Sequence, residues 1–357
     1  MNRKSTRVTI YDIAKELNIS PSTVTRALNN QSCISDSTRR NVQQAANRMG
    51  YHRNGWSSTS KGVRNVKLGL ILRDKFPEYQ NLIVAGAKRA CTELSDGGLE
   101  LEYCLLDVQD YGKRLVDKVQ EMIQNGCNGI SFTMGPLSCK NALREVLRGS
   151  NIKVSTMYYD ACRDFSNFFV GVDFQTSGMI AADLLHMLGL QRGDVVALLT
   201  GSRSLTQHDL SCQGFIKLAD QYGFSVRLIE HQDNEKIAYL ATEQLLTEEP
   251  ELKGIFCSTA VTVPVCKKLK EAGRAQDVVM IGTELLTNCI PYLKDDTLNA
   301  VLFQNPFKLG YLSCKTMLSC ISETPLSSRG LYINPQIVIR GNLDHYVDRI
   351  TSIETEY

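Results

Sequence analysis

Polar residues that could contact DNA bases recur at helical spacing near the amino terminus. They are Ser22, Thr25, Arg26 and Asn29. The apolar residues between them, Val24, Ala27 and Leu28, share the opposite face of the same predicted helix. An arginine can bind guanine through two hydrogen bonds, an asparagine can pair with adenine, and hydroxyl groups can reach base edges or phosphates. The pattern indicates a helix that enters a DNA groove, and a small amphipathic hairpin with an ordinary polar face is the alternative.

A pair of short helices must position that polar face. The first helix has apolar residues at helical spacing, namely Ile10, Ile13, Ala14 and Leu17. Asn18 tolerates a left-handed backbone and can end this helix, while Ser20 can cap a second helix whose first residue is Pro21. A third helix is predicted over Thr38–Arg48, with Ser35 as its cap. The three helices form a small domain with a marginal core of its own.

Positive charge is concentrated in this part of the chain. Up to Asn65 the sequence has 11 basic and 3 acidic residues, a net charge of +8, whereas the rest has 29 basic and 35 acidic residues, a net charge of −6. A basic segment attached to a mildly acidic body is typical of nucleic-acid binding. A solvated basic tail would give the same count, but it would not carry helical periodicity.

The stretch from Val8 to Tyr51 resembles the headpiece of the lactose/galactose repressor (LacI/GalR) family. The resemblance rests on the motifs T-I-x-D-I-A, S-x-S-T-V-x-R-x-L-N, I-S-D-x-T-R and M-G-Y, in that order. It implies that Pro21, Ser22 and Arg26 occupy base-reading positions, with further contacts to base edges and the DNA backbone around them. The complete set of expected DNA-contacting residues is Thr9, Tyr11, Pro21, Ser22, Thr23, Thr25, Arg26, Asn29 and Cys33.

The segment after Tyr51 departs from that family. Relatives have a proline before the asparagine that matches Asn54, followed by a hinge helix whose leucine enters the minor groove. Here Arg53 replaces the proline and Ser60 stands at the leucine position, among glycine and serine residues that disfavour a helix. The operator is then bent less, or Trp56 supplies the apolar contact, or Trp56 packs on the body. Asn54, Trp56 and Ser60 are the expected hinge residues.

The composition of the chain describes a large globular body. Its 357 residues are 43% hydrophobic, and neither an apolar leader nor a run of eighteen apolar residues is present, so a cytoplasmic location without a membrane partner is expected. Twelve cysteines are scattered without a C-x-x-C pair, which predicts reduced core residues rather than disulfides or metal ligands. No metal and no cofactor are expected.

Strand-like and helical runs alternate from Val66 onward, which predicts parallel sheets with crossover helices in two lobes. The body resembles the periplasmic-binding-protein-like effector domain of the same family. The expected fold class is therefore α/β, with an all-α helix-turn-helix headpiece (1–52), a hinge or linker (53–65) and a two-lobed effector-binding and dimerisation domain (66–350). Lobe 1 is expected at about 66–171 and 302–332, and lobe 2 at about 172–300 and 333–350.

Polar residues near the carboxyl ends of the predicted strands are candidates for binding a small molecule, because ligands bind at that edge of parallel sheets. The candidates are Arg73, Asp74, Tyr79, Gln80, Arg203, His208, Asp209, Ser258, Thr259, Glu284 and Gln304. The resemblance favours Glu284 and Gln304, since relatives bind sugar hydroxyls with an acid and a glutamine there. If Arg73 and Arg203 both face the cleft, the ligand is an anion such as a sugar acid or sugar phosphate; otherwise each is a surface residue.

No catalytic motif stands out in the body. The sequence predicts a DNA-binding transcriptional regulator, a repressor, that acts as a homodimer on double-stranded operator DNA. Its effector is expected to be a small carbohydrate-like molecule: a sugar, sugar acid or sugar phosphate. The alternative is a solute-binding protein of a sugar transport system, which would need an export signal and no basic helical head.

Overall fold

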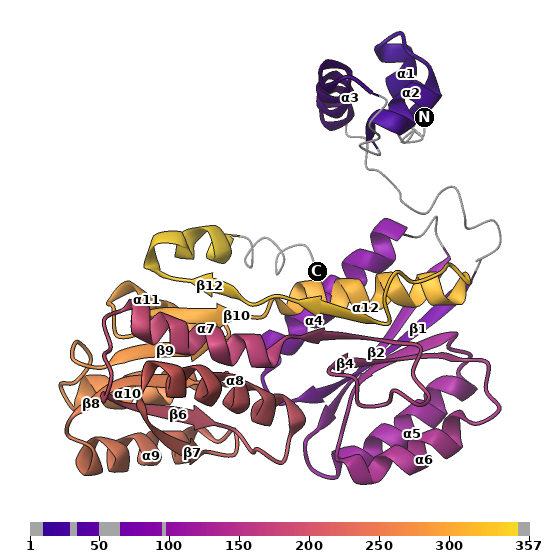
Figure 1. Cartoon of the computed structure of the whole chain (residues 1–357). Coiled ribbons are helices and arrows are strands. Elements are labelled where there is room, and N and C mark those ends of the chain that lie inside the picture. Colours follow the sequence, from indigo (N-terminus) through magenta and orange to yellow (C-terminus); the bar gives the residue numbers. More distant parts are fainter. Residues whose placement is uncertain (1–9, 29–33, 50–64, 95–97, 349–357) are drawn as a thin grey trace, which may run out of the picture. The chain divides into compact units, whose positions relative to one another are not determined.

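The computed structural model describes residues 10–28, 34–49, 65–94 and 98–348, and the chain divides into two compact units, 1–61 and 62–357. Each unit is described by itself (Figure 1). The predicted hinge residues Asn54, Trp56 and Ser60, and the predicted DNA contacts Thr9, Asn29 and Cys33, lie outside the described residues.

The first unit contains the three predicted helices, α1 (Ile10–Glu16), α2 (Pro21–Leu28) and α3 (Asp36–Arg48). Asn18 has a φ of 53° and ends α1, as its tolerance of the left-handed region predicted. Ser20 Oγ accepts a hydrogen bond from the backbone N–H of Thr23 at 3.1 Å, and Ser35 Oγ accepts one from Thr38 at 3.2 Å. The buried core consists of Ile13, Ala14, Val24, Ala27, Val42, Ala45 and Ala46.

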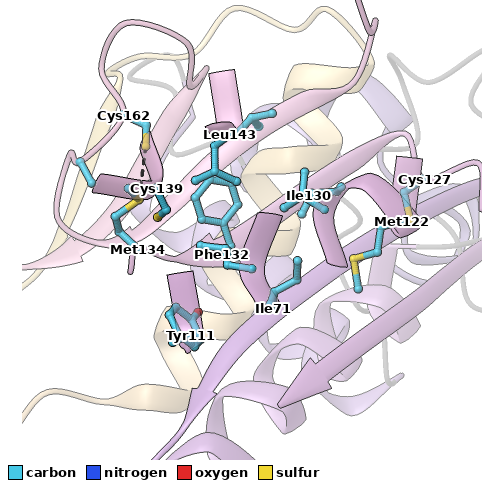
Figure 2. Packing of buried hydrophobic residues seen from close by; sticks show 14 residues of the cluster. Ile71, Tyr111, Met122, Cys127, Ile130, Phe132, Met134, Cys139, Leu143 and Cys162 are labelled. Carbon is cyan, nitrogen blue, oxygen red and sulfur yellow. Dashed lines mark hydrogen bonds between the residues drawn. The ribbon is translucent and has the colours of Figure 1, made fainter. Parts of the chain in front are cut away.

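The second unit begins with a six-stranded sheet, sheet A, whose order is β11-β5-β4-β3-β1-β2 and whose strands are all parallel. Its strands are β1 (Val66–Asp74), β2 (Leu99–Asp107), β3 (Gly129–Thr133), β4 (Lys153–Tyr158), β5 (Phe168–Val172) and β11 (Gly330–Ile333). Helices α5 (Tyr111–Gln124) and α6 (Lys140–Leu147) cover one face, and α4 (Pro77–Leu94) and α12 (Pro306–Ile321) cover the other. Figure 2 shows Ile71, Ile130 and Phe132 of the strands packed in the first of these interfaces.

Sheet B has the order β12-β10-β9-β8-β6-β7, with only β12 antiparallel to its neighbour. Its strands are β6 (Val195–Thr200), β7 (Ser225–Glu230), β8 (Leu252–Cys257), β9 (Val279–Thr283), β10 (Ala300–Phe303) and β12 (Gln336–Val338). Its helices are α7 (Phe174–Met187), α8 (Thr206–Tyr222), α9 (Glu235–Glu248), α10 (Thr262–Glu271) and α11 (Ile290–Lys294). Helices α7 and α8 pack on the face that carries Phe256 and Ile281, and α9 and α10 belong to the opposite face.

Both lobes use glycines to bring two helices into backbone contact. A Cβ on Gly86 of α4 would lie 1.9 Å from the carbonyl oxygen of Phe307, and one on Gly310 of α12 would lie 1.9 Å from that of Ile83. In lobe 2, Gly214 of α8 approaches the carbonyl of Gln175 in the same way, at 1.9 Å. Any side chain at these positions would push the helices apart, which explains why Gly214, directly before Phe215, is a glycine.

The chain passes between the sheets three times, after β5, after β10 and after β11. The lobe boundary expected at residue 302 is wrong by a few residues, because β10 through Phe303 pairs with β9 and β12 in sheet B. Near the carboxyl end two short strands lie in different sheets: β11 joins sheet A and β12 joins sheet B. Asp173, at the first passage, caps α7 by accepting a hydrogen bond from the Thr176 N–H at 2.9 Å.

The cysteines of the described residues are all free, and nine of them are buried. Within the described ranges, no helix is long and apolar enough to span a membrane. No cluster of three or more His, Cys, Asp or Glu side chains suited to a metal ion occurs among those same residues.

Candidate functional site

The polar face of α2 is open to solvent in the first unit. Ser22, Thr25 and Arg26 are exposed, Pro21 and Thr23 are partly exposed, and the intervening Val24 and Ala27 are buried. That burial fixes the rotation of the helix, because the two apolar residues can face the core only if the polar ones face outward.

Hydrogen bonds hold the start of that polar face in place. Ser20 Oγ lies 2.7 Å from Ser22 Oγ and 2.8 Å from Thr23 Oγ1, and Thr25 Oγ1 donates to the carbonyl of Pro21 at 2.9 Å. Tyr11 of α1 is 68% exposed. Six of the predicted DNA contacts, those at 11, 21, 22, 23, 25 and 26, are therefore carried by the first two helices of one small domain.

A second candidate site is a cleft in the body, where the carboxyl ends of strands from both sheets meet. The open space between its walls, out to and including the mouth, is about 740 Å³. Eight of the predicted ligand residues line it: Arg73, Tyr79, Gln80, His208, Ser258, Thr259, Glu284 and Gln304. Strand ends far apart in the sequence thus converge on one cavity.

Three predicted ligand residues do not line the cleft, and for them the prediction is wrong. Asp74 is exposed at the end of β1. The guanidinium of Arg203 lies 2.7 to 2.8 Å from Asp209 Oδ1, so the two side chains neutralise each other, with Arg203 40% exposed. The argument for an anionic ligand required Arg203 as well as Arg73, and it therefore loses one of its two cations.

The cleft also contains residues that were not predicted. They are Lys75, Phe76, Tyr158, Phe174, Gln207, Asp233, Ala260 and Thr283. Tyr158 is the last residue of β4 and Asp233 lies in the loop after β7, so both stand at carboxyl ends of strands, where the same rule would have included them. Phe174 and Gln207 lie in the first turns of helices, and no sequence signal separates them from other helix starts.

Glu284 is the most enclosed ionisable group of the cleft. It follows β9 at a φ of 66° and is only 4% exposed, and neither carboxyl oxygen has a hydrogen-bond partner. Burial raises the pKa of this carboxyl to about 8, with the backbone amide of Gln304 partly opposing the shift. A left-handed non-glycine residue and an unpartnered buried carboxyl both cost free energy, a combination typical of functional positions.

The wall from sheet A is aromatic and cationic. The rings of Tyr79 and Tyr158 lie 6.3 Å apart between centroids, and burial raises the pKa of both phenols, so both are neutral donors at physiological pH. The Arg73 guanidinium carbon lies 5.6 Å from the ring centroid of Tyr111, and its buried Nε has no hydrogen-bond partner. The Gln80 side chain stabilises the turn before α4, because its Oε1 accepts a hydrogen bond from the Phe76 N–H at 3.0 Å.

The wall from sheet B is rich in acceptors. Ser258 Oγ donates to Thr200 Oγ1 at 2.8 Å and is satisfied. In contrast, Gln207 Oε1, Asp233 Oδ1 and both oxygens of Glu284 are buried without a partner. Because the Glu284 carboxyl is protonated at neutral pH, it offers one acceptor and one donor. With Gln207 Oε1, Asp233 Oδ1 and the Arg73 Nε, the cleft thus holds three unsatisfied acceptors and two unsatisfied donors, which a molecule with several hydroxyl groups would fit.

Comparisons with known proteins match the head and the body separately. Residues 9–54 match the bacterial regulatory proteins of the lacI family, and residues 68–324 match the periplasmic binding protein domain. The chain is 24% identical over 349 residues to the maltose regulon regulatory protein MalI of Escherichia coli K12, covering 93% of this chain and 98% of that one. It is 21% identical to the HTH-type transcriptional repressor PurR of Glaesserella parasuis, covering 94% and 98%.

Among solved structures, the body is similar to a solute binding protein of an ABC transporter from Burkholderia graminis in complex with D-arabinose. The TM-score is 0.72 at 20% identity, over 79% of this chain and 98% of that one, which establishes the shared two-lobed fold. The helical head and the body thus match the two parts of one kind of protein, and the chain belongs to the LacI family of DNA-binding bacterial regulators, with a periplasmic binding protein domain as its body.

Proposed function

We propose that this regulator is a repressor whose affinity for its operator is controlled by a neutral, polyhydroxylated small molecule bound in the cleft. The observation that carries the proposal is the excess of buried acceptors there, at Gln207, Asp233 and Glu284, because hydroxyl groups supply the donors that these atoms lack. A relative named the maltose regulon regulatory protein and solved neighbours in complex with D-arabinose and D-fucose support the same class of ligand.

The buried acceptors of the cleft favour a neutral polyol over an anion. Arg73 and Lys75 line it together with Asp233 and Glu284. A carboxylate or phosphate group could pair with the cations, but it supplies no donor to the acceptors of Gln207, Asp233 and Glu284. A sugar hydroxyl can donate to the acids and accept from the arginine.

The regulator is proposed to act in the cytoplasm as a homodimer. A single α2 helix reads only one short half-site, and two copies related by a two-fold axis would read a near-palindrome. Closure of the cleft around the ligand would change the relation between the two heads, a coupling typically of about 1 to 3 kcal/mol.

The same cleft would also suit a solute-binding protein of a sugar transport system, since the solved neighbours are of that kind. The head distinguishes the two functions. A transport protein has no use for a helix that presents Ser22, Thr25 and Arg26 to solvent beside a matched lacI-type segment. The head therefore favours a regulator over a transport protein.

The DNA-binding half of the proposal is tested with Arg26. A duplex selected by the full-length protein from a random pool serves as the operator, and binding is measured against an unrelated duplex at fixed salt. Replacing Arg26→Ala should reduce the preference roughly 5- to 150-fold, since a bidentate base contact discriminates by about 1 to 3 kcal/mol. The matched control is Lys15→Ala, an exposed basic residue of α1, which should weaken binding to both duplexes alike.

Retention of the full preference by Arg26→Ala would show that α2 does not read the operator.

The ligand half of the proposal is tested by thermal unfolding of the full-length protein with D-arabinose, D-fucose and D-allose, and with gluconate and glucose 6-phosphate as anionic comparators. A neutral sugar at about 100 times its Kd should stabilise the body by about 2.7 kcal/mol. Stabilisation by the anions alone would refute the neutral class.

A further inference from the structure

His208 and Asp233 lie side by side on the sheet B wall of the cleft, and no hydrogen lies between their facing atoms. His208 Nδ1 lies 3.1 Å from the carbonyl oxygen of Ser202. A carbonyl only accepts, so Nδ1 must carry the hydrogen, and in the neutral ring Nε2 is then a bare acceptor. That Nε2 lies 3.7 Å from Asp233 Oδ2, so two acceptors face each other.

The surroundings keep the His208 ring neutral. The side chain is mostly buried, and desolvation lowers its pKa more than the carboxylate of Asp233 and the carbonyl of Ser202 raise it. The charged groups that act on the ring are Asp233 and Glu230, which favour its protonated form, and Arg73, which opposes it. The ring therefore does not supply the missing proton at neutral pH.

The backbone holds this pair in place. Asp233 and its neighbour Gln232 both have left-handed φ angles, 53° and 55°, which set the direction of the loop after β7. A Cβ on Gly201 would lie 2.3 Å from the His208 ring and 2.7 Å from Asp233 Oδ1, so only glycine leaves room for both side chains. Three strained or restricted positions thus converge on one pair of acceptors, away from Glu284 in the sequence and on different loops.

We propose that His208 Nε2 and Asp233 Oδ2 form a specificity-determining subsite that binds two adjacent hydroxyl groups of the ligand, one donating to each acceptor. The inference rests on the proposed function and narrows its ligand to polyols with a vicinal diol at the end of the molecule that faces the loop after β7. A ligand that presents a carboxylate or a phosphate at that end, or lacks one of the two hydroxyl groups, is disfavoured, because it leaves at least one of the two acceptors without a donor.

The experiment uses the full-length protein and the member of the set D-arabinose, D-fucose and D-allose that raises Tm most. Calorimetry then compares the wild type with Asp233→Asn. The asparagine amide can donate to His208 Nε2, so the pair becomes satisfied within the protein and no longer needs the ligand. The Kd should rise at least 10-fold while the Tm of the ligand-free protein is unchanged or higher. The control Asp220→Asn, at an exposed position of α8, should leave the Kd unchanged.

A second measurement separates a lost subsite from a general disturbance. The wild type should bind one monodeoxy derivative of the chosen sugar at least 10-fold more weakly than the sugar itself, and in Asp233→Asn that difference should shrink below 3-fold. Equal Kd values for Asp233→Asn and the wild type, or a difference that persists in the variant, would overturn the inference.

A third readout needs no ligand. Nitrogen-15 spectra of the histidine side chains at pH 7 should show His208 protonated only at Nδ1. A ring that is protonated at both nitrogens, or at Nε2 alone, would overturn the subsite whatever the sugar. Failure of all three sugars to stabilise the protein would instead refute the proposed function, and with it the ligand named here.

Discussion

The two lobes share a scaffold but differ in what they present to the cleft. Each has a parallel sheet, and each has a pair of helices that touch through glycines, Gly86 with Gly310 in one lobe and Gly214 with Gly178 in the other. At the cleft, lobe 1 contributes the neutral phenols of Tyr79 and Tyr158 and a cation, whereas lobe 2 contributes unsatisfied acceptors. The two lobes thus share a scaffold, whereas the hydrogen-bond donors and acceptors of the cleft come mainly from different lobes.

Because the two walls of the cleft differ in this way, a ligand can use both only when the cleft closes. A polyol can accept from the donors of one wall and donate to the acceptors of the other, so its binding energy is complete only when both walls reach it. One direct link between the lobes is independent of any ligand: Glu78 Oε1, at the start of α4, accepts from both the backbone N–H and the hydroxyl of Thr287 at 2.8 Å.

The largest expected effect concerns the acceptor wall. Because Glu284 has a folded-state pKa near 8 and an unfolded value near 4.3, the folded protein binds the proton more tightly, and its stability falls as the pH rises between those values. Between pH 5 and pH 8 the free energy of unfolding of the wild type should fall by at most about 4 kcal/mol for this reason, and Glu284→Gln should not show that fall. The measurement is denaturant unfolding of the ligand-free body across that pH range.

The matched control for that slope is Glu251→Gln, an exposed carboxyl that should leave the pH dependence unchanged. An identical pH slope in the variant and the wild type would mean that Glu284 is ionised in the ligand-free cleft, and the contrast between the two walls would be smaller than described.

The shared scaffold is tested by adding one methyl group to each lobe. Gly310→Ala and Gly214→Ala each place a Cβ against a backbone carbonyl, and each should destabilise its lobe by about 3 kcal/mol, at the upper end of typical overpacking costs. The control Gly341→Ala places its methyl group in open space and should be close to neutral. Thermal unfolding that responds to only one of the two substitutions would show that the lobes do not share this packing.

The smallest effect concerns the link between the lobes. Glu78→Gln keeps the shape of the side chain but weakens the two hydrogen bonds to Thr287, at a cost of about 1 kcal/mol to the closed arrangement. Sugar affinity should fall about fivefold without any change in which sugar binds best. Calorimetry over the sugar set checks this, and a changed order of preference would place Glu78 among the ligand contacts.

The fold was largely predictable because most of its signals are local. The caps at Ser20 and Ser35 and the left-handed Asn18 were predicted from neighbouring residues, and the structure has all three. The separation of β11 from β12 depends on long-range pairing, because the two strands pair with different sheets. The Asn334-Pro335 dipeptide between them was the available local signal, since proline cannot continue a ladder of hydrogen bonds.

The cleft was less predictable than the recognition helix. On α2, helical periodicity alone states which side chains point outward. At strand ends, sequence position gives the edge of the sheet but not the direction of the side chain, so Asp74 points to solvent and Arg203 pairs with Asp209 instead. Gln207 reaches the cleft from a helix start, a position that the strand-end rule does not cover.

The three passages between the sheets affect how the body is made on the ribosome. Sheet A lacks its edge strand β11 and its covering helix α12 until both have left the exit tunnel, and by then five strands of sheet B have already been synthesised. The nascent chain must therefore carry an unfinished first lobe while the second lobe assembles. Truncation anywhere before Ile333 would leave both lobes incomplete. A premature stop shortly before that residue should therefore yield a chain that is degraded, rather than a DNA-bound regulator without a sensor.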